Sequence, residues 1–107
     1  QLVFILQRGV RFPQGPPNMA YVYFLLAKPE CNISYIGWTY DLKRRIKQHN
    51  DGLGAKFTRG RKWKLIYFEL HDNKNAALKR EHELKKNRIL RNQIKKTFKN
   101  IDILNDI

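Results

Sequence analysis

The sequence predicts a small α+β domain in which a short, mainly antiparallel three-stranded sheet is flanked by helices, in the order β-β-α-β-α-α. The first observation behind this fold class is that segments rich in aromatic and β-branched residues alternate with segments in which apolar residues have helical spacing. The second is size and composition: 107 residues suffice for one domain with a modest core, and a hydrophobic content of 42% argues against disorder.

Residues 1–18 precede the expected sheet, and we expect them to form a flexible N-terminal extension. Three prolines and a glycine between residues 11 and 18 interfere with strand pairing and with helix formation. Met19 follows directly and is the only methionine, so we expect the functional domain to span residues 19–107.

Two strands come first in this domain, at residues 20–27 and 34–39. The first contains the run YVYFLL and the second reads SYIGWT, and aromatic and β-branched residues of this kind favour strands. Pro29 and Asn32 lie between the two segments and favour a turn. We therefore expect an antiparallel hairpin.

A helix is expected after the hairpin. Leu42 and Ile46 recur at i and i+4, either Thr39 or Asp41 can cap the first turn, and the sequence NDG at residues 50–52 can end the helix. The segments that follow are a basic loop, a third strand and two further helices, at residues 54–62, 63–69, 75–87 and 90–99.

The chain is strongly basic, with 22 lysines and arginines, 9 acidic residues and a net charge of +13. Such a chain attracts polyanions, and nucleic acid is the first candidate because binding releases the counterions of its phosphates. An anionic membrane surface would usually require a long basic amphipathic helix. The apolar run at residues 2–6 has about a quarter of the length of a membrane-spanning helix. We expect a nucleic-acid partner and no membrane contact.

Cys31 is the only cysteine, so the chain can form neither a disulfide framework nor a four-cysteine zinc site by itself. This usage is typical of a reducing compartment, and we expect an intracellular location, either cytoplasmic or nuclear. The sequence indicates no particular protein partner or oligomeric state.

Candidate chemistry lies on two of the expected helices. Arg45 and His49 are four residues apart and share a helix face, where a guanidinium can hold a phosphate while an imidazole transfers a proton. On the next helix, rotation of about 100° per residue turns Glu81 toward the apolar stripe and Glu83 toward solvent. An inward carboxylate needs a partner, which is either a divalent cation or Lys85.

Tyrosines on the expected hairpin complete the candidate set. Strand alternation puts Tyr21 and Tyr23 on one face of the first strand, and Tyr35 and Gly37 on one face of the second, so two phenols can converge. Because Gly37 lacks a Cβ atom, it would let a ligand backbone approach the strand closely. Taken singly, strand tyrosines are more often structural than catalytic, and only the joint pattern favours chemistry.

These motifs resemble the GIY-YIG nuclease family over residues 19–88. Residues 35–50 read YIGWTYDLKRRIKQHN, residues 54–60 read GAKFTRG, and Glu81 follows on the next helix. The resemblance is closest to the small stand-alone domains, the SLX-type structure-specific nucleases and UvrC-like nuclease domains. Tyr21 replaces the glycine of the first family triplet, and the zinc-binding RING-like region of SLX-type proteins is absent because the chain has one cysteine.

The resemblance implies hydrolysis of a DNA phosphodiester with one divalent cation, Mg²⁺ or Mn²⁺, held by Glu81. Tyr23 would activate the attacking water, His49 would relieve it of a proton, and Arg45 would hold the scissile phosphate. Tyr35 would orient water or phosphate, or take the role of base instead. A tyrosine base needs a pKa below its ordinary value of about 10, and nearby cations can supply that shift.

The implied substrate is branched, flapped or damaged DNA in repair or recombination. The alternative is a catalytically silent nucleic-acid-binding module on the same fold, and a protein-interaction module is a weaker third hypothesis. Contacts to the nucleic-acid backbone are expected from the first helix and the basic loop, namely Lys43, Arg44, Lys56, Thr58, Arg59, Arg61 and Lys62. Phe57 could stack on an unpaired base, Trp38 and Trp63 are expected in the core, and His71 and His82 are expected on the surface.

Overall fold

The computed structural model describes residues 2–4, 19–29 and 32–103. Within these ranges lie four strands, three α-helices and one short 3₁₀ turn. In chain order these elements are β1 (Leu2–Phe4), β2 (Ala20–Lys28), β3 (Ser34–Thr39), α1 (Leu42–Asn50), the 3₁₀ turn η1 (Lys56–Thr58), β4 (Lys62–His71), α2 (Lys74–Lys86) and α3 (Arg88–Phe98). The expected α+β class is confirmed.

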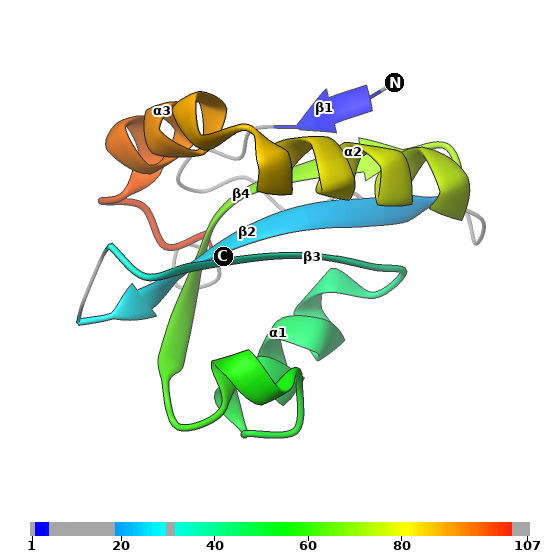
Figure 1. Cartoon of the computed structure of the whole chain (residues 1–107). Helices are drawn as coiled ribbons and strands as arrows, with labels where there is room; N and C mark the ends of the chain where they lie inside the picture. The colour runs from blue at the N-terminus through cyan, green and yellow to red at the C-terminus, as the bar shows by residue number, and fades with distance from the viewer. Residues whose placement is uncertain (1, 5–18, 30–31, 104–107) are drawn as a thin grey trace.

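The strands form one antiparallel sheet in the order β1-β4-β2-β3 (Figure 1). The three expected strands and the expected hairpin are present. A fourth strand, β1, pairs with the outer edge of β4, with Leu2 opposite Leu70 and Phe4 opposite Phe68. These residues belong to the segment expected as a flexible extension, and residues 5–18 of that segment lie outside the described ranges.

The central strand β2 is buried on both faces, because helices cover both sides of the sheet (Figure 1). On one face Tyr23 and Leu25 pack with Leu42 and Ile46 of α1. On the other face Phe24 and its neighbours pack with apolar residues of α2 and α3, which are Ala77, Leu84 and Ile94. Alternation along β2 therefore directs Tyr23 toward α1.

The tryptophans differ in burial. Trp63 is 2% exposed and belongs to the core, as expected. Trp38 is only partly buried, since it lies on the edge strand β3 and packs against the core from its rim. No helix within the described ranges is long and apolar enough to cross a membrane.

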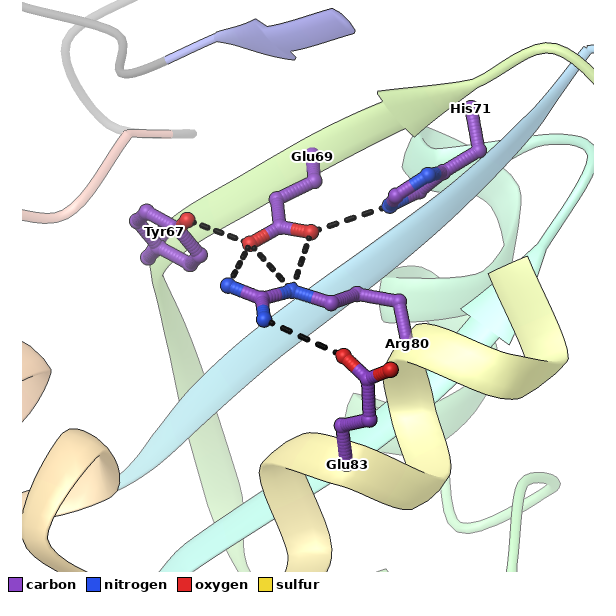
Figure 2. Close-up of polar contacts among 5 residues, drawn as sticks. All are labelled: Tyr67, Glu69, His71, Arg80 and Glu83. Carbon is purple, nitrogen blue, oxygen red and sulfur yellow. Dashed lines mark hydrogen bonds and ion pairs between the residues drawn. The ribbon is translucent and has the colours of Figure 1, made fainter. Parts of the chain in front are cut away.

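A buried carboxylate joins α2 to the sheet (Figure 2). Glu69 on β4 is fully buried, and Arg80 on α2 donates to both of its carboxylate oxygens at 2.9 to 3.1 Å. The hydroxyl of Tyr67 donates to Oε2 at 2.5 Å and Nε2 of His71 donates to Oε1 at 2.9 Å. Burial raises the pKa of Glu69, but these hydrogen bonds outweigh it and hold the pKa below its ordinary value.

The expectation that His71 lies on the surface is wrong. Its side chain is 3% exposed, because β4 continues two residues beyond the expected end at Glu69 and alternation turns Tyr67, Glu69 and His71 toward the same face. The other histidine expected on the surface, His82, is exposed on α2.

Candidate active site

Tyr23 and His49 form the centre of the site. Tyr23 lies in the middle of β2 and His49 in the last turn of α1, and both side chains are almost completely buried, at 1% and 0% exposure. The Tyr23 hydroxyl oxygen is 2.7 Å from Nε2 of His49. The structure therefore brings together the phenol and the imidazole that the sequence pattern singled out.

Thr58 also belongs to this cluster, although a different role was expected for it. It was expected among the nucleic-acid contacts, but η1 turns its side chain inward, where it is 0% exposed and cannot reach a backbone phosphate. Its hydroxyl lies 2.8 Å from Nδ1 of His49. No local pattern in the sequence indicates this contact. In the structure, a Cβ atom on Gly54 would collide with Nδ1 of His49, so the loop that carries Thr58 passes close to the imidazole.

Gly37 has a different role from the one expected. It lies opposite Tyr23 in the β2–β3 ladder, and a Cβ atom at this position would come within 2.5 Å of the Tyr23 hydroxyl oxygen. The expectation that this glycine leaves room for a ligand backbone is wrong, because the tyrosine ring fills that space. Gly37 thus permits the placement of Tyr23.

Tyr35 joins the same cluster from β3. Its ring centroid is 5.0 Å from that of His49 and 6.3 Å from that of Tyr23. Phe57 of η1 stacks on Tyr35 at 6.3 Å and is 53% exposed, and the Arg61 guanidinium lies over the Phe57 ring. Tyr35 is only partly buried, so it is the phenol closer to solvent.

Arg45 lies one helical turn before His49, as the i+4 spacing predicts. Its guanidinium donates to Oε1 of Gln48 at 3.1 Å and borders a surface hollow of about 430 Å³. The hollow is lined by Trp38, Thr39, Tyr40, Asp41, Arg44, Arg45 and Gln48. Arg44 and Arg45 bring positive charge to this hollow beside the carboxylate of Asp41, and Arg45 is close enough to Tyr23 to act on the pKa of its phenol.

The helix phase predicted for Glu81 and Glu83 is confirmed. The Glu81 side chain is 16% exposed, whereas that of Glu83 is 53% exposed. Lys85 lies 3.5 Å from the Glu81 carboxylate, so the ion pair weighed as an alternative is present. The pair is 3.5 Å long and half of the lysine side chain is exposed, so it contributes little to stability.

The described residues contain no group of three histidine, cysteine, aspartate or glutamate side chains that could enclose a metal. A lone carboxylate still fits Mg²⁺, which keeps several waters and binds proteins through one or two carboxylates together with substrate phosphate. The donor set at Glu81 is therefore compatible with an oxygen-binding cation and not with a closed zinc site.

Charges around Tyr23 act in opposite directions. Burial raises the pKa of the phenol well above its ordinary value, and the nearby Arg45 opposes this shift only in part. Tyr35 and Glu81 add to the rise, which places Glu81 in the electrostatic neighbourhood of the site. The lowered pKa that a tyrosine base requires is not found. Burial and then the charge of Arg45 lower the pKa of His49 to about 4, so the imidazole is neutral at pH 7.

A basic surface borders the cluster. Six of the seven residues expected to contact nucleic acid are exposed on α1, on the segment from η1 to β4 and at the first residue of β4, namely Lys43, Arg44, Lys56, Arg59, Arg61 and Lys62. Several of them are close neighbours of Arg45 or Phe57 in the sequence.

The sheet holds the two candidate tyrosines, α1 carries an arginine and a histidine, and α2 carries a glutamate, which is the class of domain that the motifs predicted. Residues 19–98 match the GIY-YIG catalytic domain, and the chain belongs to this family. The resemblance drawn from the motifs is thereby confirmed. The family is one of nucleases, which generally use a divalent metal and act on DNA.

Similar proteins carry the family name UPF0213. The UPF0213 protein of Clostridium perfringens is 53% identical over 76 residues, which cover 70% of this chain and 77% of the relative. That of Haloquadratum walsbyi is 48% identical over 66 residues, covering 61% and 72%. A UPF0213 protein of Streptococcus pyogenes is 46% identical over 70 residues, covering 63% and 72%. No solved structure matches the chain.

Proposed function

We propose that the protein is a metal-dependent endonuclease that hydrolyses a phosphodiester bond in branched, flapped or damaged DNA. The observation that carries the proposal is the 2.7 Å contact between the Tyr23 hydroxyl and the neutral His49, beside Arg45 on the same helix. A proton donor and acceptor next to a phosphate-binding guanidinium are what phosphodiester hydrolysis requires. The functional domain proposed is residues 19–107, in agreement with the start of the family match at Met19.

In the proposed mechanism, Arg45 holds the scissile phosphate at the rim of the hollow. Tyr35, the more exposed phenol, orients the attacking water. The Tyr23 oxygen takes a proton from this water while its own proton passes to Nε2 of His49, so the phenol never has to exist as a free phenolate. This concerted transfer reconciles the raised pKa of Tyr23 with a role as base, because the neutral imidazole receives the charge.

Glu81 is the proposed ligand of a single Mg²⁺ or Mn²⁺. When bound, the cation neutralises negative charge on the phosphoryl and leaving-group oxygens. The exposed cations Lys43, Arg44, Lys56, Arg59, Arg61 and Lys62 are proposed to contact the DNA backbone and to set its orientation.

Cleavage assays on linear, flapped and four-way DNA, with and without Mg²⁺ or Mn²⁺, test this function. We expect Glu81→Ala and Arg45→Ala to abolish cleavage while circular dichroism shows a retained fold. Glu83→Ala, two residues away on the solvent side of α2, is the matched control and should keep activity. Unaltered cleavage by purified Glu81→Ala would refute the proposed metal site.

The rival function is a silent nucleic-acid-binding module, which the exposed basic surface would also support. Under that hypothesis the protein would bind DNA in a salt-sensitive manner and give no metal-dependent product on any substrate. The intact set of acid–base residues around Tyr23 favours the enzyme.

A further inference from the structure

Thr58 lies behind His49, on the side of the imidazole that faces away from Tyr23. Its hydroxyl oxygen is 2.8 Å from Nδ1 of His49 and 2.8 Å from the backbone oxygen of Ala55. The threonine and the histidine are both fully buried. These contacts extend the Tyr23–His49 pair into a chain of hydrogen bonds that ends on the backbone of the basic loop.

The direction of each hydrogen bond in this chain follows from its last group, the backbone oxygen of Ala55. A carbonyl oxygen can only accept, so the Thr58 hydroxyl must donate its single proton to Ala55. The hydroxyl oxygen is then the acceptor for His49, and Nδ1 must carry a hydrogen. A neutral imidazole has one N–H group, so Nε2 is left with a free lone pair and accepts from the Tyr23 hydroxyl.

We infer that Thr58 is a positioning residue that holds His49 in the tautomer protonated at Nδ1, which makes Nε2 the acceptor for the Tyr23 proton. The tautomer follows from the geometry of the chain alone, whereas its importance for cleavage rests on the proposed function. The lowered pKa of His49 agrees with a neutral imidazole at pH 7.

The surrounding loop holds the Thr58 hydroxyl in place. The backbone N–H of Thr58 donates to the oxygen of Ala55 at 3.0 Å, and its backbone oxygen accepts from the indole N–H of the buried Trp63 at 3.0 Å. Gly54 allows the loop to approach His49 closely. Phe57 and Arg59, on either side of Thr58, are exposed, so the loop turns these flanking side chains to solvent while the Thr58 hydroxyl contacts the imidazole.

The first test is a long-range ¹H–¹⁵N correlation spectrum of the wild-type protein at pH 7, which reports directly on the protonated nitrogen of His49. We expect the hydrogen on Nδ1. A hydrogen on Nε2 would overturn the inference, and this spectrum requires no substitution and no nuclease activity. A wild-type protein that shows the Nδ1 tautomer but cleaves no DNA would refute the proposed nuclease while leaving the assignment of the tautomer intact.

The second test compares three variants in the same spectrum and in cleavage assays. Thr58→Val keeps the shape but lacks the hydroxyl, so we expect loss of the single Nδ1 tautomer. We also expect a kcat lower by about 10- to 100-fold with KM little changed, which is part of the roughly 100-fold or more that general acid–base catalysis contributes. Thr58→Ser keeps the hydroxyl and should restore both readouts. Thr97→Val, on the exposed face of α3, is the matched control and should match the wild type. A Thr58→Val protein that retains the wild-type tautomer would contradict the positioning role, whatever its activity.

Discussion

Removing Arg80 should strongly destabilise the protein, because it leaves a buried carboxylate without its cation (Figure 2). Three hydrogen bonds join Arg80 to Glu69, which is fully buried. Breaking one side of a buried ion pair costs about 3–5 kcal/mol. The Arg80 side chain is 24% exposed and Glu69 keeps its bonds to Tyr67 and His71, so we expect the lower end for Arg80→Ala, about 3 kcal/mol. This is a large part of the roughly 5–15 kcal/mol that stabilises a domain of this size.

The destabilisation should depend on pH in a defined direction. In the wild type the pKa of Glu69 is lower in the folded protein than its ordinary value of 4.5, so its contribution is present above pH 4.5 and is lost as pH falls through the folded pKa. In Arg80→Ala the guanidinium no longer opposes the effect of burial, so the pKa of Glu69 in the folded protein rises. As pH falls, protonation of Glu69 then removes the cost of burying its unpaired charge. The difference in unfolding free energy should therefore shrink from pH 7 to pH 4.

Urea unfolding followed by tryptophan fluorescence at both pH values measures this difference. Arg59→Ala removes an exposed arginine and is the matched control, with an expected change within about 0.5 kcal/mol. A loss below 1 kcal/mol at pH 7, or a loss of equal size at pH 4, would refute the reasoning. Arg80 immediately precedes Glu81 on α2, so we also expect slower cleavage by this variant.

Three further predictions concern the site and its surface. Gly37→Ala places a Cβ atom within 2.5 Å of the Tyr23 hydroxyl oxygen, so we expect cleavage to fall sharply and the unfolding free energy to fall by about 1–3 kcal/mol. Unchanged cleavage together with unchanged unfolding free energy would contradict the packing of Tyr23 against Gly37. The ring resonances of His49 should titrate near pH 4, and titration near 6.5 would contradict its burial. The contribution of His49 to stability should be lost as pH falls from 6.5 toward 4, because the histidine of the unfolded chain binds a proton at a higher pH than the buried one. Arg59→Ala should weaken DNA binding and lower the slope of log Kd against log salt by about one, whereas Lys79→Ala, exposed on α2, should leave the slope unchanged.

Local patterns in the sequence predicted most of the fold and part of the candidate site. Strand composition located the hairpin and β4, and helical spacing located α1 and α2. The same spacing placed Arg45 and His49 one turn apart and separated the inward Glu81 from the exposed Glu83. These features depend on backbone periodicity over a few residues, which the order of residues alone encodes.

Contacts between distant segments could not be predicted in this way. The pairing of β1 with β4 depends on which sheet edge is open, and the length of β4, which decides the burial of His71, depends on its neighbours in the sheet.

The sequence by itself determined the fold class, the basic character of the chain and the set of residue types suited to phosphodiester chemistry. Only the tertiary structure decided that Thr58 faces His49 and that Gly37 makes room for Tyr23. The physical reason is that the direction of a side chain in a loop, and the space beside a glycine, depend on atoms that are distant in the chain and become neighbours only when the sheet and α1 pack together.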